Sequence, residues 1–136
     1  MEFLGQNTKG VQEQMIIPLS DESSFLVSQE GVYSFSMPYE FHIDKIYLMC
    51  NTAPLDADII VDLNVNNLSI MTILPKIEDG DTNSDDGSTN PSFFTGKEKI
   101  TALTPITIDI DQVGVSGTEG KGLKMMLIGH RSHSLD

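Results

Sequence analysis

Short runs in which apolar and polar residues alternate are the feature that most restricts the fold of this 136-residue chain. Alternation puts every second side chain on one face of an extended strand, whereas a helical pattern would repeat every 3.6 residues. Pro, Gly and Asn interrupt the runs at short intervals, as is typical of strands joined by turns. We expect strands over 12–19, 32–37, 41–50, 58–64, 68–73, 106–111 and 123–128, with short helices allowed over 76–81 or 96–103.

Two local irregularities refine this pattern. The apolar positions of the 41–50 strand change phase between Ile43 and Ile46, which predicts a β-bulge near Asp44 and Lys45. Two consecutive asparagines at 66–67 separate two alternating runs, and asparagine tolerates the positive φ of tight turns. The second irregularity therefore predicts a hairpin.

The fold class expected from these elements is all-β: a single antiparallel β-sandwich or jelly roll. Hydrophobic residues make up 39% of the chain and there is no Trp, so Ile, Val, Leu, Met and Phe must form the core. The length fits one domain. We divide the chain into an N-terminal arm (1–10), the sandwich (11–129) and a C-terminal tail (130–136).

Charge and cysteine content restrict the partners and the compartment. Twenty acidic residues against eight basic ones give a net charge of -12, which argues against nucleic acid and anionic membranes as partners. No apolar run is long enough to cross a bilayer, and the first residues show no secretion signal. The single cysteine, Cys50, lies in an apolar run and is expected to pack in the core. A chain without a disulfide framework suits assembly in a reducing compartment.

Catalytic patterns are not evident, so we expect no enzymatic activity and no cofactor. There is no Gly-x-Ser-x-Gly motif, and Cys50 lies within an expected strand. Asp109 and Asp111 share a strand face and could act as paired carboxylates, but alternation in a sheet with one solvated face explains them without any chemistry. No phosphate-binding glycine loop occurs.

Histidines raise one question about metal. His130 and His133 have a spacing that could bring two imidazoles to one ion, although a solvated tail explains them without metal. His42 lies in an expected strand, where a packed or edge histidine is the simpler interpretation.

An acidic segment offers oxygen ligands at alternate positions: Asp79, Asp81, Asn83 and Asp85. Calcium takes six to eight oxygens, so these residues are candidate ligands. The match to an EF-hand loop is partial, because Asn90 stands where that loop has glutamate. An exposed acidic loop of ordinary turn composition is the alternative interpretation.

Four motifs follow one another along the chain: FSMPYEF at 35–41, VDLN at 61–64, IDID at 108–111 and GLKMMLIG at 122–129. In this order they resemble a family of virion structural proteins of tailed phages. The resemblance covers residues 17–131 and departs in the acidic segment 78–96, which is longer here than expected.

The resemblance implies a trimeric β-sandwich on the virion surface, made in the host cytoplasm and without catalytic residues. A short single-domain chain favours a capsid decoration (cement) protein, which bridges capsomers by binding the major capsid protein or another virion protein. One alternative is a tail-fibre adhesin that binds a host surface glycan, for which Tyr33, Tyr39 and Tyr47 could stack on sugars. A free-standing calcium-dependent carbohydrate-binding module is a further alternative.

Assembly contacts are expected in the two terminal segments. Phe3 and Leu4 form an apolar pair on a short polar arm, and His130 and Arg131 begin the tail. The alternative for Phe3 and Leu4 is that they cover one edge of their own domain.

Overall fold

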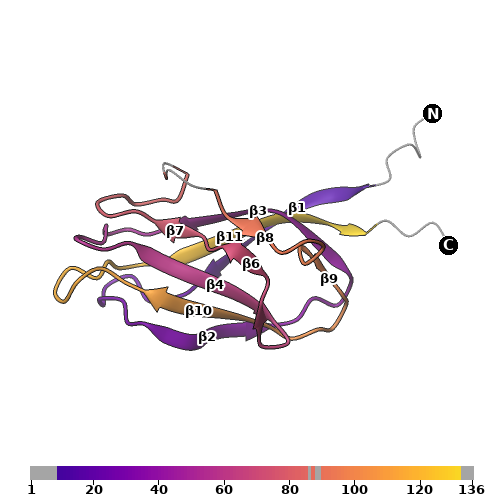
Figure 1. Cartoon of the computed structure of the whole chain (residues 1–136), viewed down its shortest axis with the longest axis horizontal. Helices are drawn as coiled ribbons and strands as arrows, with labels where there is room; N and C mark the ends of the chain where they lie inside the picture. Colours follow the sequence, from indigo (N-terminus) through magenta and orange to yellow (C-terminus); the bar gives the residue numbers. More distant parts are fainter. Residues whose placement is uncertain (1–8, 86, 88–89, 133–136) are drawn as a thin grey trace.

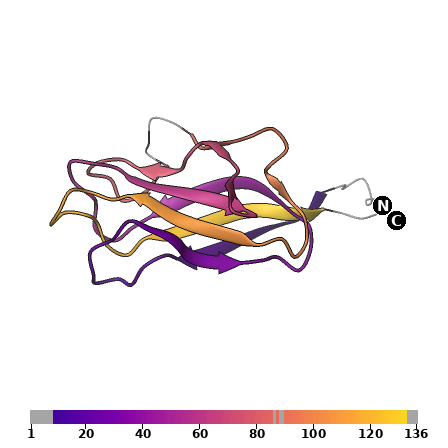
Figure 2. The same cartoon turned by 60° about the horizontal axis from the view of Figure 1, so that its bottom comes forward.

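The computed structural model describes residues 9–85, 87 and 90–132, and these contain two larger antiparallel sheets packed together and a two-stranded third sheet (Figure 1). Figure 2 shows the two layers from a second direction. The predicted all-β sandwich is confirmed. The first sheet has the order β1 (Lys9–Pro18), β11 (Lys124–Ser132), β3 (Phe41–Met49) and β9 (Lys99–Ile100). The second sheet has the order β2 (Gln29–Phe35), β10 (Ile106–Gln112), β4 (Ile59–Val65) and β5 (Leu68–Ser69), with β7 (Lys76–Ile77) also paired to β4.

Alternation along the strands builds the core between the sheets. In β4, Ile59, Val61 and Leu63 are each 0% exposed, and Ile106 and Ile108 of β10 lie beside them. The intervening residues, Ile60 and Asp62 in β4, are only partly buried and point to the outer face. Burial of these branched side chains supplies the main driving force for folding.

The predicted bulge is present in β3. Lys45 pairs with Ile128 of β11 and Ile43 pairs with Gly129, so Asp44 is the extra residue between them. An extra residue turns the strand locally and re-aims its own side chain. The bulge therefore keeps Ile43 and Ile46 in the core while Asp44 points outward.

The predicted hairpin is present but short. Asn66 and Asn67 have φ values of 53° and 66°, the left-handed pair that a two-residue hairpin turn requires. The strand predicted over 68–73 leaves β4 after Ser69, and its second half forms β6 (Met71–Ile73), paired with β8 (Ser92–Phe93).

Neither of the short helices allowed by the pattern forms. Residues 76–77 and 99–100 are the strands β7 and β9. The described part of the chain has no helix that is long and apolar enough to cross a membrane.

Sandwich boundaries differ from the sequence-based ones. β1 begins at Lys9 and β11 continues to Ser132, and these two residues pair with each other. His130 and Arg131, which the sequence assigned to the tail, lie in β11 because they pair with the start of β3. The sheet thus continues past both predicted limits.

Gly129 is expected to be irreplaceable, because a Cβ there would lie 2.2 Å from the His42 carbonyl oxygen and 2.7 Å from the Phe41 ring. Gly129→Ala should lower the free energy of unfolding by about 1–3 kcal/mol, as overpacking does. Urea denaturation measures this, with Ser34→Ala at an exposed position of β2 as the control, expected to change stability by less than about 0.5 kcal/mol. Equal stability of the two variants would contradict the close approach of β3 and β11.

Candidate functional site

Two histidines and one aspartate converge on the outer face of the first sheet. His42 in β3 and His130 in β11 are direct cross-strand partners. The bulge places Asp44 beside both: its Oδ1 lies 3.2 Å from His42 Nδ1 and its Oδ2 lies 2.9 Å from His130 Nδ1. The imidazole rings stack with centroids 4.8 Å apart and an interplanar angle of 26°. One carboxylate thus bridges two imidazoles.

Electrostatics around Asp44 favour its charged form. Partial burial alone would raise the pKa of this carboxyl, but the hydrogen bonds and charge of His130 and His42 outweigh it, so the pKa lies below its ordinary value. His42 Nε2 also lies 4.0 Å from Glu98 Oε2. The cluster is therefore a set of nitrogen and oxygen donors held by two paired strands.

Sequence reasoning assigned these histidines differently. His130 was considered with His133, which lies outside the described residues, whereas its partner in the structure is His42. His130 is buried rather than solvated, and His42 is half-buried at the sheet surface. The predicted bulge singled out Asp44 in the sequence. Only the pairing of β3 with β11 shows that Asp44 lies beside both histidines.

Arg131, a predicted assembly contact, has partners within the chain. Its Nε donates to Glu13 Oε2 at 2.8 Å, and its guanidinium lies 4.2 Å from the centre of the Tyr39 ring. The Tyr39 hydroxyl donates to Glu13 at 3.0 Å. Arg131 thereby ties β11 to β1. The other predicted contacts, Phe3 and Leu4, lie outside the described residues.

The acidic segment proposed for calcium serves mainly as an edge for β3. The Leu48 N–H donates to Ser84 Oγ at 2.9 Å, the Ser84 N–H donates to the Leu48 carbonyl at 3.0 Å, and the Cys50 N–H donates to the Thr82 carbonyl at 2.9 Å. The segment therefore continues the first sheet over a short stretch.

Two of its four candidate ligands accept hydrogen bonds in separate places. Asp79 Oδ1 accepts from the Asp56 N–H at 2.9 Å, and Asn83 Oδ1 accepts from the Asp85 N–H at 3.0 Å. Among the His, Cys, Asp and Glu side chains of the described residues, His42, Asp44 and His130 are spaced closely enough to share a metal ion. Asp79, Asp81 and Asp85 belong to no such group.

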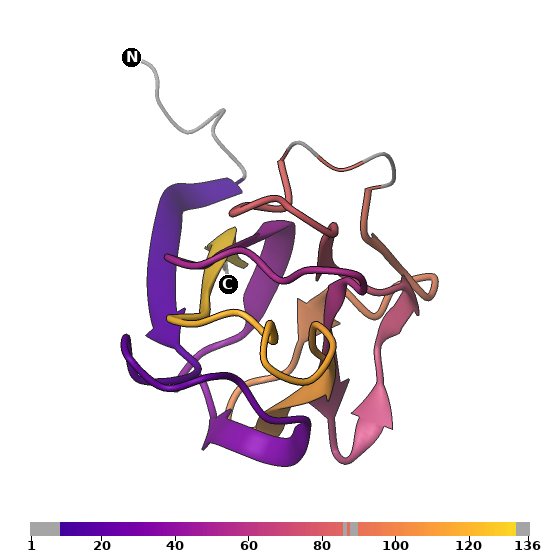
Figure 3. The ribbon, with the colours of Figure 1, turned by 90° about the vertical axis from the view of Figure 1, so that its left-hand side faces the viewer.

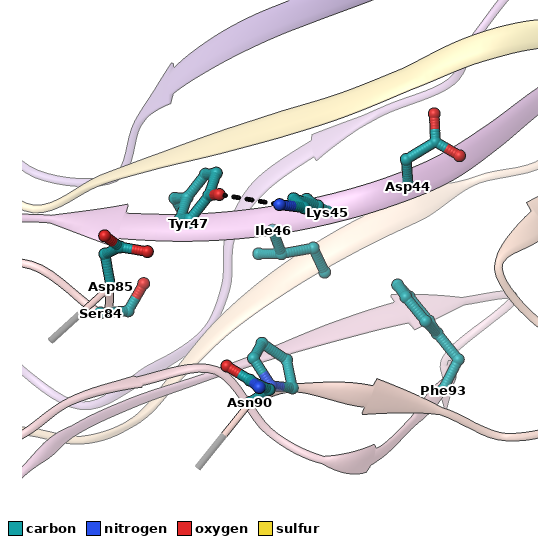
Figure 4. Close-up of a pocket in the computed structure, with 9 residues that line it drawn as sticks. Asp44, Lys45, Ile46, Tyr47, Ser84, Asp85, Asn90 and Phe93 are labelled. Atoms are coloured by element: carbon teal, nitrogen blue, oxygen red, sulfur yellow. Dashed lines mark hydrogen bonds between the residues drawn. The ribbon is translucent and has the colours of Figure 1, made fainter. Parts of the chain in front are cut away.

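A pocket of about 320 Å³ lies along the edge of β3 (Figure 4). The Ile43 N–H donates to the Glu98 carbonyl, and the Leu48 carbonyl accepts from the Ser84 N–H. Between these two residues, no strand in the described part of the chain pairs with this edge of β3. Polar groups and an aromatic ring border the opening, a combination suited to a small polar ligand. Its lining residues are Asp44, Lys45, Ile46, Tyr47, Ser84, Asp85, Asn90, Pro91 and Phe93.

Carboxylates gather on the outer face of the second sheet. Asp62 and Asp109 are cross-strand partners. Asp109 accepts hydrogen bonds from the Asn64 amide at 2.8 Å and the Gly31 N–H at 2.7 Å, and Asp62 accepts one from the Ser69 hydroxyl at 2.6 Å. Burial raises the pKa of Asp62, and the charge of Asp109 raises it further. The hydrogen bonds from the Ser69 hydroxyl and the Leu63 N–H lower this pKa but do not outweigh burial. Each carboxylate thus has a structural explanation.

Cys50, which the sequence predicted in the core, is half-buried and packs against the core from its edge. Burial raises the pKa of its thiol to about 11. The thiol is therefore protonated near neutral pH, and a protonated thiol is a poor nucleophile.

Comparison with known proteins adds nothing to this geometry: no family model, curated protein or solved structure matches the chain. Function must therefore be argued from the site and the surface.

Neutralising Asp62 should stabilise the fold near neutral pH. Its raised pKa means that the folded state binds a proton more tightly than the unfolded state, so its ionised form costs stability once the pH exceeds the folded pKa. Asp62→Asn should therefore raise the free energy of unfolding at pH 7, and the gain should shrink as the pH falls through the folded pKa. Urea denaturation across a pH series measures both effects.

Asp21→Asn is the control for this series, because the backbone hydrogen bonds of Ser24 and Ser23 lower the pKa of Asp21. It should give no gain at pH 7. A loss of stability in Asp62→Asn that does not change with pH would contradict the electrostatic argument.

Proposed function

We propose that this chain is a non-enzymatic structural protein of a tailed-phage virion: a capsid decoration protein that forms a homotrimer and bridges capsomers on the head surface. The ordered motifs at 35–41, 61–64, 108–111 and 122–129 support the virion class. The structural observation that carries the proposal is the free edge of β1.

β1 is the terminal strand of the first sheet, and Figure 3 shows it at the margin of the molecule in indigo. It is ten residues long, and within the described residues it pairs with β11 alone. A long unprotected edge presents unpaired N–H and C=O groups to another chain. Val11 and Ile16 on this strand are 79% and 56% exposed. These features favour pairing with a neighbour in an assembly.

An apolar row continues inward from this edge. Ile16 pairs with Met126, which pairs with Tyr47, and Ile128 follows two residues later in β11. We call these four residues the outer patch. Ile16 is exposed and the other three are partly exposed, and an adjacent set of such residues on one sheet face is typical of an interaction surface. The strongly acidic remainder of the chain disfavours contact between copies elsewhere.

The alternative is a tail-fibre adhesin, which the pocket at the β3 edge favours. Asp85 and Asn90 offer hydrogen-bonding groups and Phe93 offers a ring, and these are the groups that proteins use to bind sugars. Of the three tyrosines considered for stacking, Tyr47 lines this pocket, whereas Tyr39 contacts Glu13 and Arg131.

Locating the protein on virions decides between these two functions. Purified virions labelled with an antibody against this chain should show label over the head in electron micrographs. Label confined to the tail would reject the decoration function and favour the adhesin, and no label on any virion would reject both.

Ile16→Glu should weaken assembly by about tenfold or more, because it puts a charge into the centre of a contact that excludes water. Sedimentation equilibrium measures self-association, and co-sedimentation with capsids lacking this protein measures binding. Leu68→Glu is the matched control: Leu68 is 72% exposed, but it lies on β5 of the second sheet. Equal effects of the two substitutions would contradict the role of the outer patch.

A further inference from the structure

The His42, Asp44 and His130 side chains are arranged at distances close to those of metal ligands. The donor atoms of all three lie within 4.8 Å of one another. In a tetrahedral zinc site with bonds of 2.0–2.1 Å, two ligand atoms are about 3.3 Å apart. Asp44 Oδ1 lies 3.2 Å from His42 Nδ1 and Asp44 Oδ2 lies 2.9 Å from His130 Nδ1, both close to this separation. Because the donor atoms of the group spread over as much as 4.8 Å, the side chains must draw together by about an ångström to bind one ion.

We propose that His42 Nδ1, His130 Nδ1 and one Asp44 carboxylate oxygen bind a divalent transition-metal ion, with zinc as the best match, and that water fills the fourth position. Two imidazoles and a carboxylate suit zinc and its neighbours, whereas calcium and magnesium prefer oxygen ligands alone. This inference is independent of the virion function proposed above.

Glu98 supports this arrangement from outside the site. A metal on His42 Nδ1 leaves the ring proton on Nε2, and Nε2 faces Glu98 Oε2 at 4.0 Å. At 4.0 Å the two atoms are too far apart for a hydrogen bond, so Glu98 must move slightly closer to accept the Nε2 proton. A carboxylate that does so fixes the tautomer and orientation of a ligating histidine. The Glu98 carbonyl also accepts from the Ile43 N–H at 2.9 Å, which holds this residue beside β3.

The backbone holds the ligands before any ion binds, and the site remains open to solvent. His42 and His130 are paired residues of adjacent strands, and the bulge directs Asp44 toward both. The His130 side chain is 11% exposed, whereas His42 and Asp44 are 34% and 31% exposed. An ion can therefore reach the donors from the outer face of the sheet, and little ordering of side chains opposes its binding.

The test uses the full chain without an affinity tag, made metal-free with a chelator. Titration calorimetry with Zn²⁺ should show one ion per chain, and Co²⁺ should produce the visible absorption of a four-coordinate site. His42→Gln, Asp44→Asn and His130→Gln should each weaken binding by more than about tenfold, and Glu98→Gln by about tenfold with unchanged stoichiometry.

His133→Gln is the matched control, since His133 is the one other histidine of the chain. It should bind Zn²⁺ like the original sequence. If His130→Gln fails to fold, Zn²⁺ binding by His42→Gln tests the proposal instead, because His42 is only half-buried. Absence of binding, binding that all the cluster variants retain, or binding that His133→Gln abolishes would each overturn the proposal.

Discussion

The pairing of β3 with β11 is the constraint on which the rest of the structure depends. It brings Gly129 so close to the backbone of His42 that no larger residue fits, and it absorbs the extra residue Asp44 as a bulge. Through this pairing the first sheet keeps Ile43 and Ile46 in the core on both sides of the bulge. The histidine cluster and three of the four residues of the outer patch follow from the same register, since they are outward-facing residues on these two strands, and Ile16 joins the patch from β1.

The outer faces of the two sheets differ in chemistry. The second sheet carries Asp62, Asp109 and Asp111 close together, and burial with mutual repulsion raises the pKa of Asp62 and Asp111. Further burial of this face would disfavour the charged carboxylates still more, so solvent contact stabilises it. The first sheet instead carries the apolar outer patch beside a free edge strand. The outer face of the first sheet is thus more apolar next to β1, whereas carboxylates gather on the outer face of the second sheet.

The assembly and metal proposals concern neighbouring parts of one surface. Ile128 of the outer patch and His130 of the cluster are successive outward residues of β11. They remain physically distinct, because the outer patch depends on apolar area and the free β1 edge, whereas the cluster depends on the position of three donor groups. A substitution can therefore remove the apolar contact of the outer patch and leave the donor groups of the cluster in place, or the reverse.

By itself the sequence determined the local structure: alternation predicted which side chains of β4 and β10 face the core, the phase change predicted the bulge near Asp44, and two asparagines predicted the turn at 66–67. These features are local because side-chain direction and turn conformation depend on adjacent residues. Only the tertiary structure decided that His130 belongs to a strand, that its partner is His42 rather than His133, and that the acidic segment extends the edge of β3. Asp44 and His130 are 86 positions apart, and which distant strands pair depends on how the whole core is buried, which no local pattern encodes.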